Sequence, residues 1–309
     1  MRIVYLGTPD FAVLPLEKLI EEGYNIVAVC TNKDKPVGRK QIMTACPVKE
    51  CAIKHGIEVF SYDKIRVEGV EDLKKLNADL FITCAFGQIL SQEILDIPKY
   101  GTFNIHGSLL PKYRGASPIQ WSVLNGEKET GITIMRTDIG VDTGDIIYQE
   151  KVAIGEDETS GELFDRLSIL GANCIIKALK LLENNEISYE KQKEEDATLT
   201  KMFKKEDAKI NFNTTTKDIH NFVRGMNPWP IAFTDYNGEV IKIFKAKKGS
   251  LIGKPGEILK SNPKDGLEVG TLDGSISILE VQKSGGKRMN ISDFLRGNKL
   301  NEGDFLGKW

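Results

Sequence analysis

The sequence predicts an α/β protein in which a mostly parallel sheet is covered by helices on both faces and is followed by a smaller β-barrel domain. Over the first hundred residues, short apolar runs alternate with amphipathic stretches, as expected when helices connect parallel strands. From residue 232 onward, short strand-like runs are separated by turns that contain Gly and Asp. Between these parts, residues 184–209 are charged and poor in apolar side chains. We therefore expect a Rossmann-like body, a linker and a C-terminal barrel.

The N-terminal alternation can be assigned element by element. The apolar runs predict strands at Ile3–Leu6, Ile26–Thr31, Val59–Phe60, Leu80–Cys84 and Thr102–Ile105. Helices are predicted at Phe11–Glu22, at Pro47–His55 and around Leu73–Leu76. Pro47 suits the first position of a helix and Gly56 the position just past its end, so the second helix is well delimited.

The first turn raises the alternative of a dinucleotide site. Its sequence, LGTPDFA, contains a single glycine. The dinucleotide fingerprint G-x-G-x-x-G needs its glycines for the close approach of the backbone to the pyrophosphate. A nicotinamide cofactor is therefore not expected.

Candidate catalytic side chains gather between residues 103 and 145. Asn104 and His106 stand two positions apart at the end of a predicted strand, so their side chains point to the same side. Asp142 follows another strand-like run, Gly131–Met135. If the two strands are neighbours in the sheet, the loops after them should lie together at one rim, where open α/β folds place their sites.

These residue types favour one kind of chemistry. The stretch contains no G-x-S-x-G elbow, and no cysteine stands beside a histidine as a nucleophile. Asn104 offers an amide donor, and His106 can donate a hydrogen bond or a proton near neutral pH. Asp142 could hold His106 in one tautomer and favour its charged form. Two donors and a carboxylate suit direct acyl transfer, in which a carbonyl oxygen becomes an oxyanion while an amine loses a proton.

Composition bounds the class of protein. The five cysteines form no C-x-x-C pair, which predicts a reduced protein without a zinc site. No apolar run approaches the roughly 18 residues of a membrane span, and Met1 leads directly into a strand, so we expect a cytoplasmic protein. Residues 208–309 carry 16 Lys and Arg against 11 Asp and Glu, a charge of +5. The remaining 26 and 33 leave −7 for residues 1–207. A basic C-terminal part hints at a polyanionic partner.

After residue 117, strands and helices alternate less regularly along the sequence than in the first hundred residues. A short helix at Ser117–Leu124, a strand at Asp145–Ile154 and a long helix from Thr159 to about Leu182 complete the body. After the linker, a helix is predicted at Lys217–Arg224. Strands are then predicted at Ala232–Tyr236, Val240–Ala246, Gly256–Leu259, Leu267–Thr271 and Ser275–Val281.

Three motifs in fixed order carry a family resemblance. They are N-x-H at Asn104–His106, SLLPKYRG directly after it, and D-x-G-x-D-T-G-D around Asp142, with His106 and Asp142 separated by 36 positions (142 minus 106). The combination resembles the formyltransferases that use 10-formyltetrahydrofolate as one-carbon donor. The start LGTPDFA and the turn N-P-W-P at Asn227–Pro230 are also typical of them. The resemblance implies an OB-fold-like second domain.

The resemblance implies roles for the candidate residues. Asn104 and His106 would stabilise the oxyanion, and Asp142 would orient His106 and help to manage the proton. Ser108, Leu109, Leu110 and Pro111 would line the folate pocket, largely through backbone contacts. The implied co-substrate is 10-formyltetrahydrofolate, with no metal. The implied acceptor is the α-amine of methionine esterified to initiator tRNA, in translation initiation.

Basic residues are the candidate tRNA contacts. The long loop NKDKPVGRKQIMTACP is solvated by one interpretation, but relatives that act on tRNA carry a D-[KR]-P-x-G-R loop here. The predicted tRNA-binding residues are Lys35, Arg39, Lys40, Lys245, Lys247, Lys248, Lys287 and Arg288. For the C-terminal ones, a merely solvated face is the alternative. The resemblance also implies that TLTKMFKKEDAKINF is an ordered connector.

The domains are predicted as a catalytic body at 1–189, a connector at 190–207 and a tRNA-binding barrel at 208–309. We expect a monomer with no membrane partner. Two other functions remain open. One is a formyltransferase of the same fold that acts on a glycinamide ribonucleotide or an amino-sugar nucleotide. The other is a non-catalytic RNA-binding module, which has no use for the geometry of Asn104, His106 and Asp142.

Overall fold

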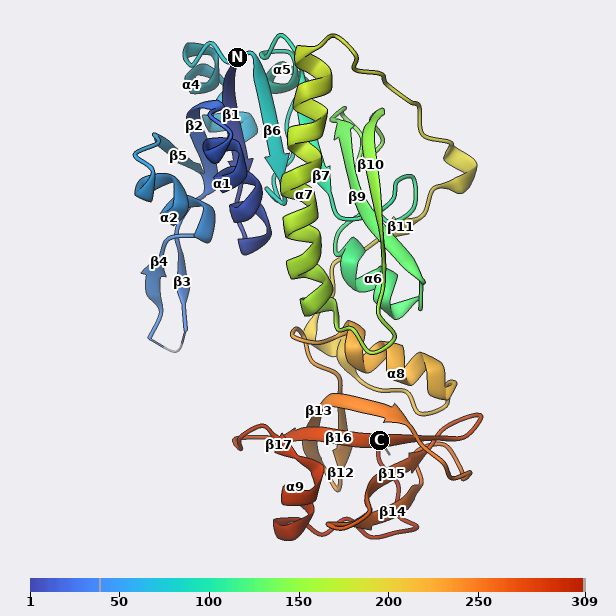
Figure 1. The fold of residues 1–309 in the computed structure, drawn as a ribbon. Helices are drawn as coiled ribbons and strands as arrows, with labels where there is room; N and C mark the ends of the chain where they lie inside the picture. The colour runs from blue at the N-terminus through green and yellow to red at the C-terminus, as the bar shows by residue number, and fades with distance from the viewer. Residues whose placement is uncertain (39, 308–309) are drawn as a thin grey trace. The chain divides into compact units, whose positions relative to one another are not determined.

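The structure is a computed structural model that describes residues 1–38 and 40–307 (Figure 1). Contacts divide it into two compact units. Unit 1 comprises Met1–Pro118, Glu129–Val152 and Phe164–Thr200, and unit 2 comprises Ile119–Lys128, Ala153–Leu163 and Lys201–Trp309. Unit 2 thus takes in two short segments that lie between the segments of unit 1 along the sequence. The domain boundaries expected at 189 and 207 stay predictions.

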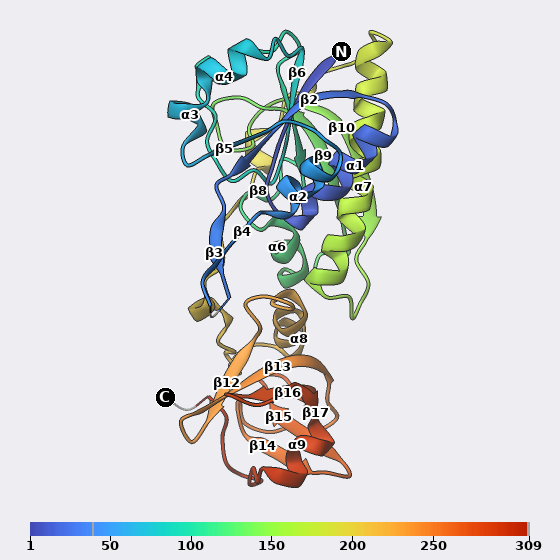
Figure 2. The same cartoon turned by 90° about the vertical axis from the view of Figure 1, so that its left-hand side faces the viewer.

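Unit 1 is built on a seven-stranded sheet in the order β10-β9-β7-β6-β1-β2-β5 (Figures 1 and 2). Its strands are β1 (Arg2–Gly7), β2 (Asn25–Asn32), β5 (Val59–Tyr62), β6 (Leu80–Cys84), β7 (Thr102–His106), β9 (Glu129–Arg136) and β10 (Ile146–Ala153). The five neighbouring strands β5, β2, β1, β6 and β7 pair in parallel, whereas β9 pairs antiparallel with β7. The mostly parallel sheet predicted from the alternation is confirmed, and the predicted N-terminal strands end within two residues of the observed ones.

Helices cover both faces of this sheet. On one face lie α1 (Val13–Glu21), α2 (Pro47–Lys54) and the long α7 (Ser160–Glu183), of which α7 crosses the sheet in Figure 1. Gly171 of α7 allows close packing there, because a Cβ at this position would lie 3.0 Å from Ile105 of β7. On the other face, a buried cluster joins β1, β2 and β6 to α3 (Ile65–Glu68), α4 (Val70–Lys75) and α5 (Gln92–Leu95). The sheet is therefore buried on both sides, which explains its continuous apolar runs.

Two segments are more regular than the sequence suggested. The basic loop after β2 forms a hairpin of β3 (Lys35–Val37) and β4 (Ile42–Thr44), which lies apart from the main sheet in Figure 1. The connector is ordered, as the resemblance implied: it holds the 3-10 turns η2 (Glu194–Asp196) and η3 (Lys205–Ala208). It also holds the short strand β11 (Leu199–Thr200), which pairs in parallel with β8 (Arg114–Gly115).

Unit 2 contains an antiparallel half-barrel sheet in the order β12-β13-β16-β15-β14, with β17 added beside β16. The strands are β12 (Phe233–Tyr236), β13 (Glu239–Lys248), β14 (Ile258–Asn262), β15 (Gly266–Gly270), β16 (Ser275–Lys283) and β17 (Met289–Asn290). Three helices pack on the core of this unit. They are α8 (Thr216–Gly225), α9 (Ile291–Gly297) and the part of α6 (Pro118–Leu124) that belongs to unit 2. The helix α9 was not predicted.

A buried carboxylate holds one edge of this barrel. Oε1 of Glu268, on β15, accepts hydrogen bonds from the backbone nitrogens of Ser250 and Leu251 at 2.5 and 2.6 Å and from Ser275 Oγ at 2.7 Å. Burial raises the pKa of Glu268, but the hydrogen bonds outweigh burial and leave that pKa below its ordinary value. Glu268 therefore stabilises the folded state in its charged form.

Replacing Glu268 with glutamine should lower the free energy of unfolding by about 2 kcal/mol at neutral pH, because bonds to a charged acceptor are stronger than bonds to an amide oxygen. In the wild type this contribution is complete above the ordinary Glu pKa of about 4.5 and is lost as the pH falls through the lower folded pKa. Denaturant unfolding between pH 3 and 7 checks this. A surface control, Glu239→Gln, should change stability by less than about 0.5 kcal/mol. Equal acid sensitivity of wild type and Glu268→Gln would contradict the assignment.

Candidate active site

Asn104 and His106 lie together on β7 and point to the same side. β7 is a central strand, paired with β6 on one side and β9 on the other. His106 is buried, with 6% of its surface exposed, whereas Asn104 is half-buried. The alternation of the strand thus places two polar side chains side by side at the site, as the i, i+2 spacing predicts.

Asp142 reaches this site by a different route from the one we expected. The prediction assumed loops leaving one rim, but β9 is antiparallel to β7, so the loop after Arg136 starts beside Phe103, away from His106. That reasoning was wrong. The loop instead folds back, and Arg136 N donates to Asp145 O at 2.8 Å where it closes. The return of the loop, and not the strand order, brings Asp142 to β7.

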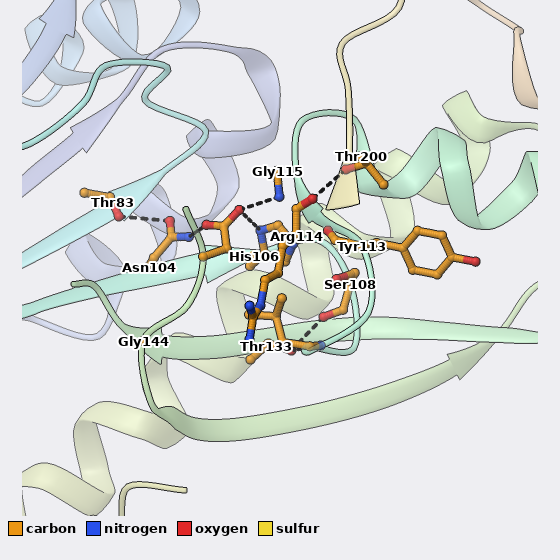
Figure 3. A network of polar contacts seen from close by, with 12 residues as sticks. Thr83, Asn104, His106, Ser108, Tyr113, Arg114, Gly115, Thr133, Gly144 and Thr200 are labelled. Atoms are coloured by element: carbon orange, nitrogen blue, oxygen red, sulfur yellow. Dashed lines mark hydrogen bonds and ion pairs between the residues drawn. The ribbon is translucent and has the colours of Figure 1, made fainter. Parts of the chain in front are cut away.

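The Asp142 carboxylate joins Asn104, His106 and Gly115, and Figure 3 shows that these three labelled residues lie close together. Its Oδ2 accepts a hydrogen bond from Gly115 N at 2.8 Å and lies 3.6 Å from His106 Nδ1. Its Oδ1 accepts from Asn104 Nδ2 at 3.4 Å. The backbone of Asp142 has a φ of 52°, in the left-handed region that is uncommon for residues other than glycine. Such backbone is typical of positions whose side chain must be aimed.

The tautomer of His106 follows from its second contact. His106 Nε2 lies 2.9 Å from the carbonyl oxygen of Tyr113. A carbonyl only accepts, so Nε2 must carry a proton and donate it. Nδ1 is then the nitrogen that faces Asp142 and can exchange a proton with a reacting group.

Asn104 is oriented by a neighbouring hydroxyl. Thr83 Oγ1, on β6, donates to Asn104 Oδ1 at 2.9 Å. Because the amide oxygen faces Thr83, as Figure 3 shows for these two labelled residues, the amide nitrogen points away from β6 and donates to Asp142. Asn104 therefore presents donors, which is what stabilising an oxyanion requires.

Several groups of the site were missed from the sequence. Gly115 and Tyr113 contribute backbone atoms, whose residue types carry no signal of this role. Gly115 has a φ of 98°, and a Cβ there would lie 2.6 Å from Thr200 O, so only glycine fits between Asp142 and the connector. The motif SLLPKYRG therefore marks two features of the site: the predicted folate loop at its start and, at its end, Gly115, whose N–H binds Asp142.

The predicted folate loop lies next to these residues. Ser108 and Leu110 are buried, whereas Leu109 and Pro111 are half-buried. Thr133 Oγ1 donates to Ser108 O and accepts from Leu110 N, and these two bonds fix the loop to β9. A folate contact through this loop therefore falls to Leu109, Pro111 and backbone groups, and it stays a prediction.

The predicted tRNA-binding residues are distributed over both units. Lys35 and Lys40 are exposed on the β3–β4 hairpin, and Arg39 lies outside the described residues. Lys245, Lys247 and Lys248 are exposed on β13, and Lys287 is exposed in the turn before β17. Arg288 forms an ion pair with Glu280 at 2.5 Å and lies over the ring of Phe244. Arg288 is thus partly engaged within its own unit.

One group of potential metal ligands occurs among the described residues, away from this network. Atoms of Glu17, Cys51 and His55 lie within 4.8 Å of one another, and Cys51 and His55 are four positions apart at the end of α2. Lys54 lies 3.9 Å from Glu17 and already supplies a positive charge there. A tetrahedral zinc site would need ligand atoms about 3.3–3.8 Å apart. We assign no metal to this group.

The sequence matches known families along both parts. Residues 1–179 match the family described as Formyl transferase, and residues 202–299 match Formyl transferase, C-terminal domain. These two matches together cover most of the chain. The protein is therefore a formyltransferase enzyme, and its Asn104 amide, His106 imidazole and Asp142 carboxylate lie together at the sheet.

Relatives of full length narrow this class. The methionyl-tRNA formyltransferase of Agathobacter rectalis is 48% identical, with 99% of each chain covered. The methionyl-tRNA formyltransferase of Acetivibrio thermocellus is 46% identical, with 100% of each chain covered. The chain belongs to the methionyl-tRNA formyltransferase family.

Solved structures share the fold. The N-formyltransferase of Helicobacter canadensis, in complex with folinic acid and dTDP-3-aminofucose, gives a TM-score of 0.69 at 26% identity, covering 91% of this chain and 98% of that one. HypX of Aquifex aeolicus, in complex with tetrahydrofolic acid, gives a TM-score of 0.64 at 20% identity, covering 100% of this chain and 51% of that one. The second likeness shows the fold alone. Within the described residues, no helix is long and apolar enough to cross a membrane.

Proposed function

We propose that this enzyme transfers the formyl group of 10-formyltetrahydrofolate to the α-amine of methionine esterified to initiator tRNA, with Asn104, His106 and Asp142 as its catalytic residues. One observation carries the assignment of these residues: the Asn104 amide and the Gly115 N–H donate to the Asp142 carboxylate, and His106 Nδ1 lies 3.6 Å from it. The absence of a nucleophile from this network favours direct attack of the amine on the formyl carbon.

The reaction balances with these groups alone. The amine nitrogen attacks the formyl carbon, and the carbonyl oxygen becomes an oxyanion in a tetrahedral intermediate. The bond between the carbon and N10 then breaks. The amine loses one proton and N10 gains one, so the products are formylmethionyl-tRNA and tetrahydrofolate. Asn104 donates to the oxyanion, and His106 does so from Nδ1 once this nitrogen has taken up a proton. Asp142 with His106 carries the proton from the amine toward N10.

The co-substrate is inferred from relatives and from the loop. The Helicobacter canadensis structure holds folinic acid, a formylated folate, at 26% identity to this chain. Leu109 and Pro111 are the half-buried members of the predicted folate loop, directly after His106. These observations support a formylated folate as the donor, bound beside β7.

The acceptor is inferred from the full-length relatives and the charge distribution. The relatives at 46–48% identity are named for methionyl-tRNA. The exposed lysines of the hairpin and of β13 offer phosphate contacts. An amino-sugar nucleotide or a glycinamide ribonucleotide would need neither surface. We infer a cytoplasmic enzyme, because initiator tRNA is charged and used in the cytoplasm, and we expect it to act as a monomer.

A formylation assay tests the proposal. With 10-formyltetrahydrofolate as donor, charged initiator tRNA, free methionine and an amino-sugar nucleotide are offered in parallel at 50 and 200 mM salt. We expect turnover on charged tRNA alone, and a fall in kcat/KM of about tenfold or more at the higher salt, because phosphate contacts release counterions. Turnover on the sugar nucleotide alone would contradict the acceptor. Folate binding without any turnover would favour the binding-module alternative.

A further inference from the structure

A glutamine of the connector holds the loop that carries Asp142. Gln192 Nε2 donates to the carbonyl oxygen of Asp142 at 2.8 Å and to that of Gly144 at 2.7 Å. The two hydrogens of one amide nitrogen thus fix two carbonyls on either side of Thr143. One of these carbonyls belongs to Asp142, the residue whose φ lies in the left-handed region.

The amide of Gln192 is itself oriented by a buried guanidinium. Arg114 is 3% exposed, and its Nε donates to Gln192 Oε1 at 2.9 Å. Its two terminal nitrogens donate to the two carboxylate oxygens of Glu194 at 3.0 and 2.8 Å. Because Oε1 must accept from Arg114, Nε2 faces the Asp142 loop. A planar, bidentate guanidinium is well suited to fix this arrangement.

The same connector also fixes the partners of Asp142 and His106. Strand β11 pairs with β8, in which Gly115 supplies the N–H bound to Asp142 Oδ2. Thr200 Oγ1 donates to Arg114 O at 2.9 Å. Tyr113, whose carbonyl accepts from His106, donates its own N–H to Thr198 Oγ1 at 2.8 Å. The connector therefore touches Asp142 on its backbone and, through β8, on its carboxylate.

From these contacts we infer that Gln192 is a positioning residue, which acts through Asp142 and is oriented by Arg114. Without Gln192 the two carbonyls lose their donors, and the Asp142 backbone is free to leave the disfavoured left-handed region. The carboxylate would then leave Gly115 N and His106. Small displacements of a catalytic group lower rate strongly. This inference rests on the proposed role of Asp142.

The test compares Gln192→Ala in two backgrounds. In the wild type we expect kcat to fall by about 10- to 100-fold, with KM for charged tRNA changed less than twofold. In the Asp142→Asn background, where the charge to be positioned is already absent, the same change should lower kcat less than threefold. The matched control is Gln92→Ala, an exposed helix position, which should retain kcat. A double-mutant cycle of this kind separates positioning from a general loss of stability, which would lower kcat in both backgrounds.

A second variant keeps the inference testable if Gln192→Ala does not fold. Gln192→Glu has the same shape but no N–H groups, and its crystal structure should show Asp142 displaced from Gly115 N. Unchanged kcat in Gln192→Ala, equal losses in both backgrounds, or an unmoved Asp142 would each overturn the inference. Failure of the proposed function is distinct, because then wild type would not formylate charged tRNA or Asp142→Asn alone would keep full kcat. Displacement of Asp142 in the Gln192→Glu structure does not depend on either.

Discussion

Replacing His106 with alanine is expected to lower kcat for formyl transfer by about 10²- to 10⁴-fold. In the proposed mechanism His106 both relays the proton and donates to the oxyanion, and only Nδ1 can do so because Nε2 is committed to Tyr113 O. Alanine removes Nδ1, and with it both of these proposed roles. The measurement is single-turnover formylation of charged tRNA under saturating folate.

Two controls separate chemistry from folding in this experiment. His106 is 6% exposed, so alanine leaves a buried cavity. His106→Gln retains most of the volume and should lose kcat to a similar extent, with a thermal unfolding midpoint near that of wild type. His55→Ala, an exposed position at the end of α2, should retain full activity. Near-wild-type kcat in both His106 variants would remove His106 from the mechanism.

Asp142→Asn is expected to lower kcat by about 10²- to 10³-fold with little effect on structure. Asparagine tolerates the left-handed φ of 52° and can still accept from Gly115 N through its amide oxygen. What the change removes is the negative charge beside His106 and the capacity to take a proton. The loss should therefore appear in kcat, and KM for tRNA should stay within about twofold.

The control for this variant is Asp96→Asn, which removes an exposed carboxylate at the end of α5. Its kcat should match that of the wild type. If Asp142→Asn raised KM with kcat unchanged, Asp142 would contribute to binding and not to the chemical step. A crystal structure of the variant with Gly115 N still bonded to residue 142 would show that geometry is preserved.

The alternation of side chains along a strand could be predicted from the sequence, whereas the direction of a strand in the sheet could not. The alternation along Thr102–His106 is a property of any strand, so the common side of Asn104 and His106 followed directly. The direction of β9 is not a local property, because apolar alternation reads the same in both senses. For this reason the path predicted for the Asp142 loop was wrong, although Asp142 does lie beside Asn104 and His106 as predicted.

The remaining misses have equally physical causes. Gly115 N and Tyr113 O are backbone groups, and every residue has such groups. The hairpin β3–β4 contains Pro36 and the exposed polar side chains of Lys35, Lys40, Gln41 and Thr44, so its composition is typical of a loop. Gln192 lies in a charged stretch that resembles a solvated linker. Only the fold-back of that stretch onto β8 gives it partners.

The ordered connector determines where the catalytic body can be joined to a different C-terminal domain. The two family matches end at residue 179 and resume at residue 202, so the intervening residues belong to neither. Yet Gln192, Thr198 and Thr200 come from that interval and bond to the loops of the site. A chimaera that exchanges C-terminal domains should therefore join the parent sequences after residue 200, so that each catalytic body keeps its own connector. For the same reason, an insertion into this interval should be tolerated best at residues 184–189, before Glu190 pairs with Ile146 of β10.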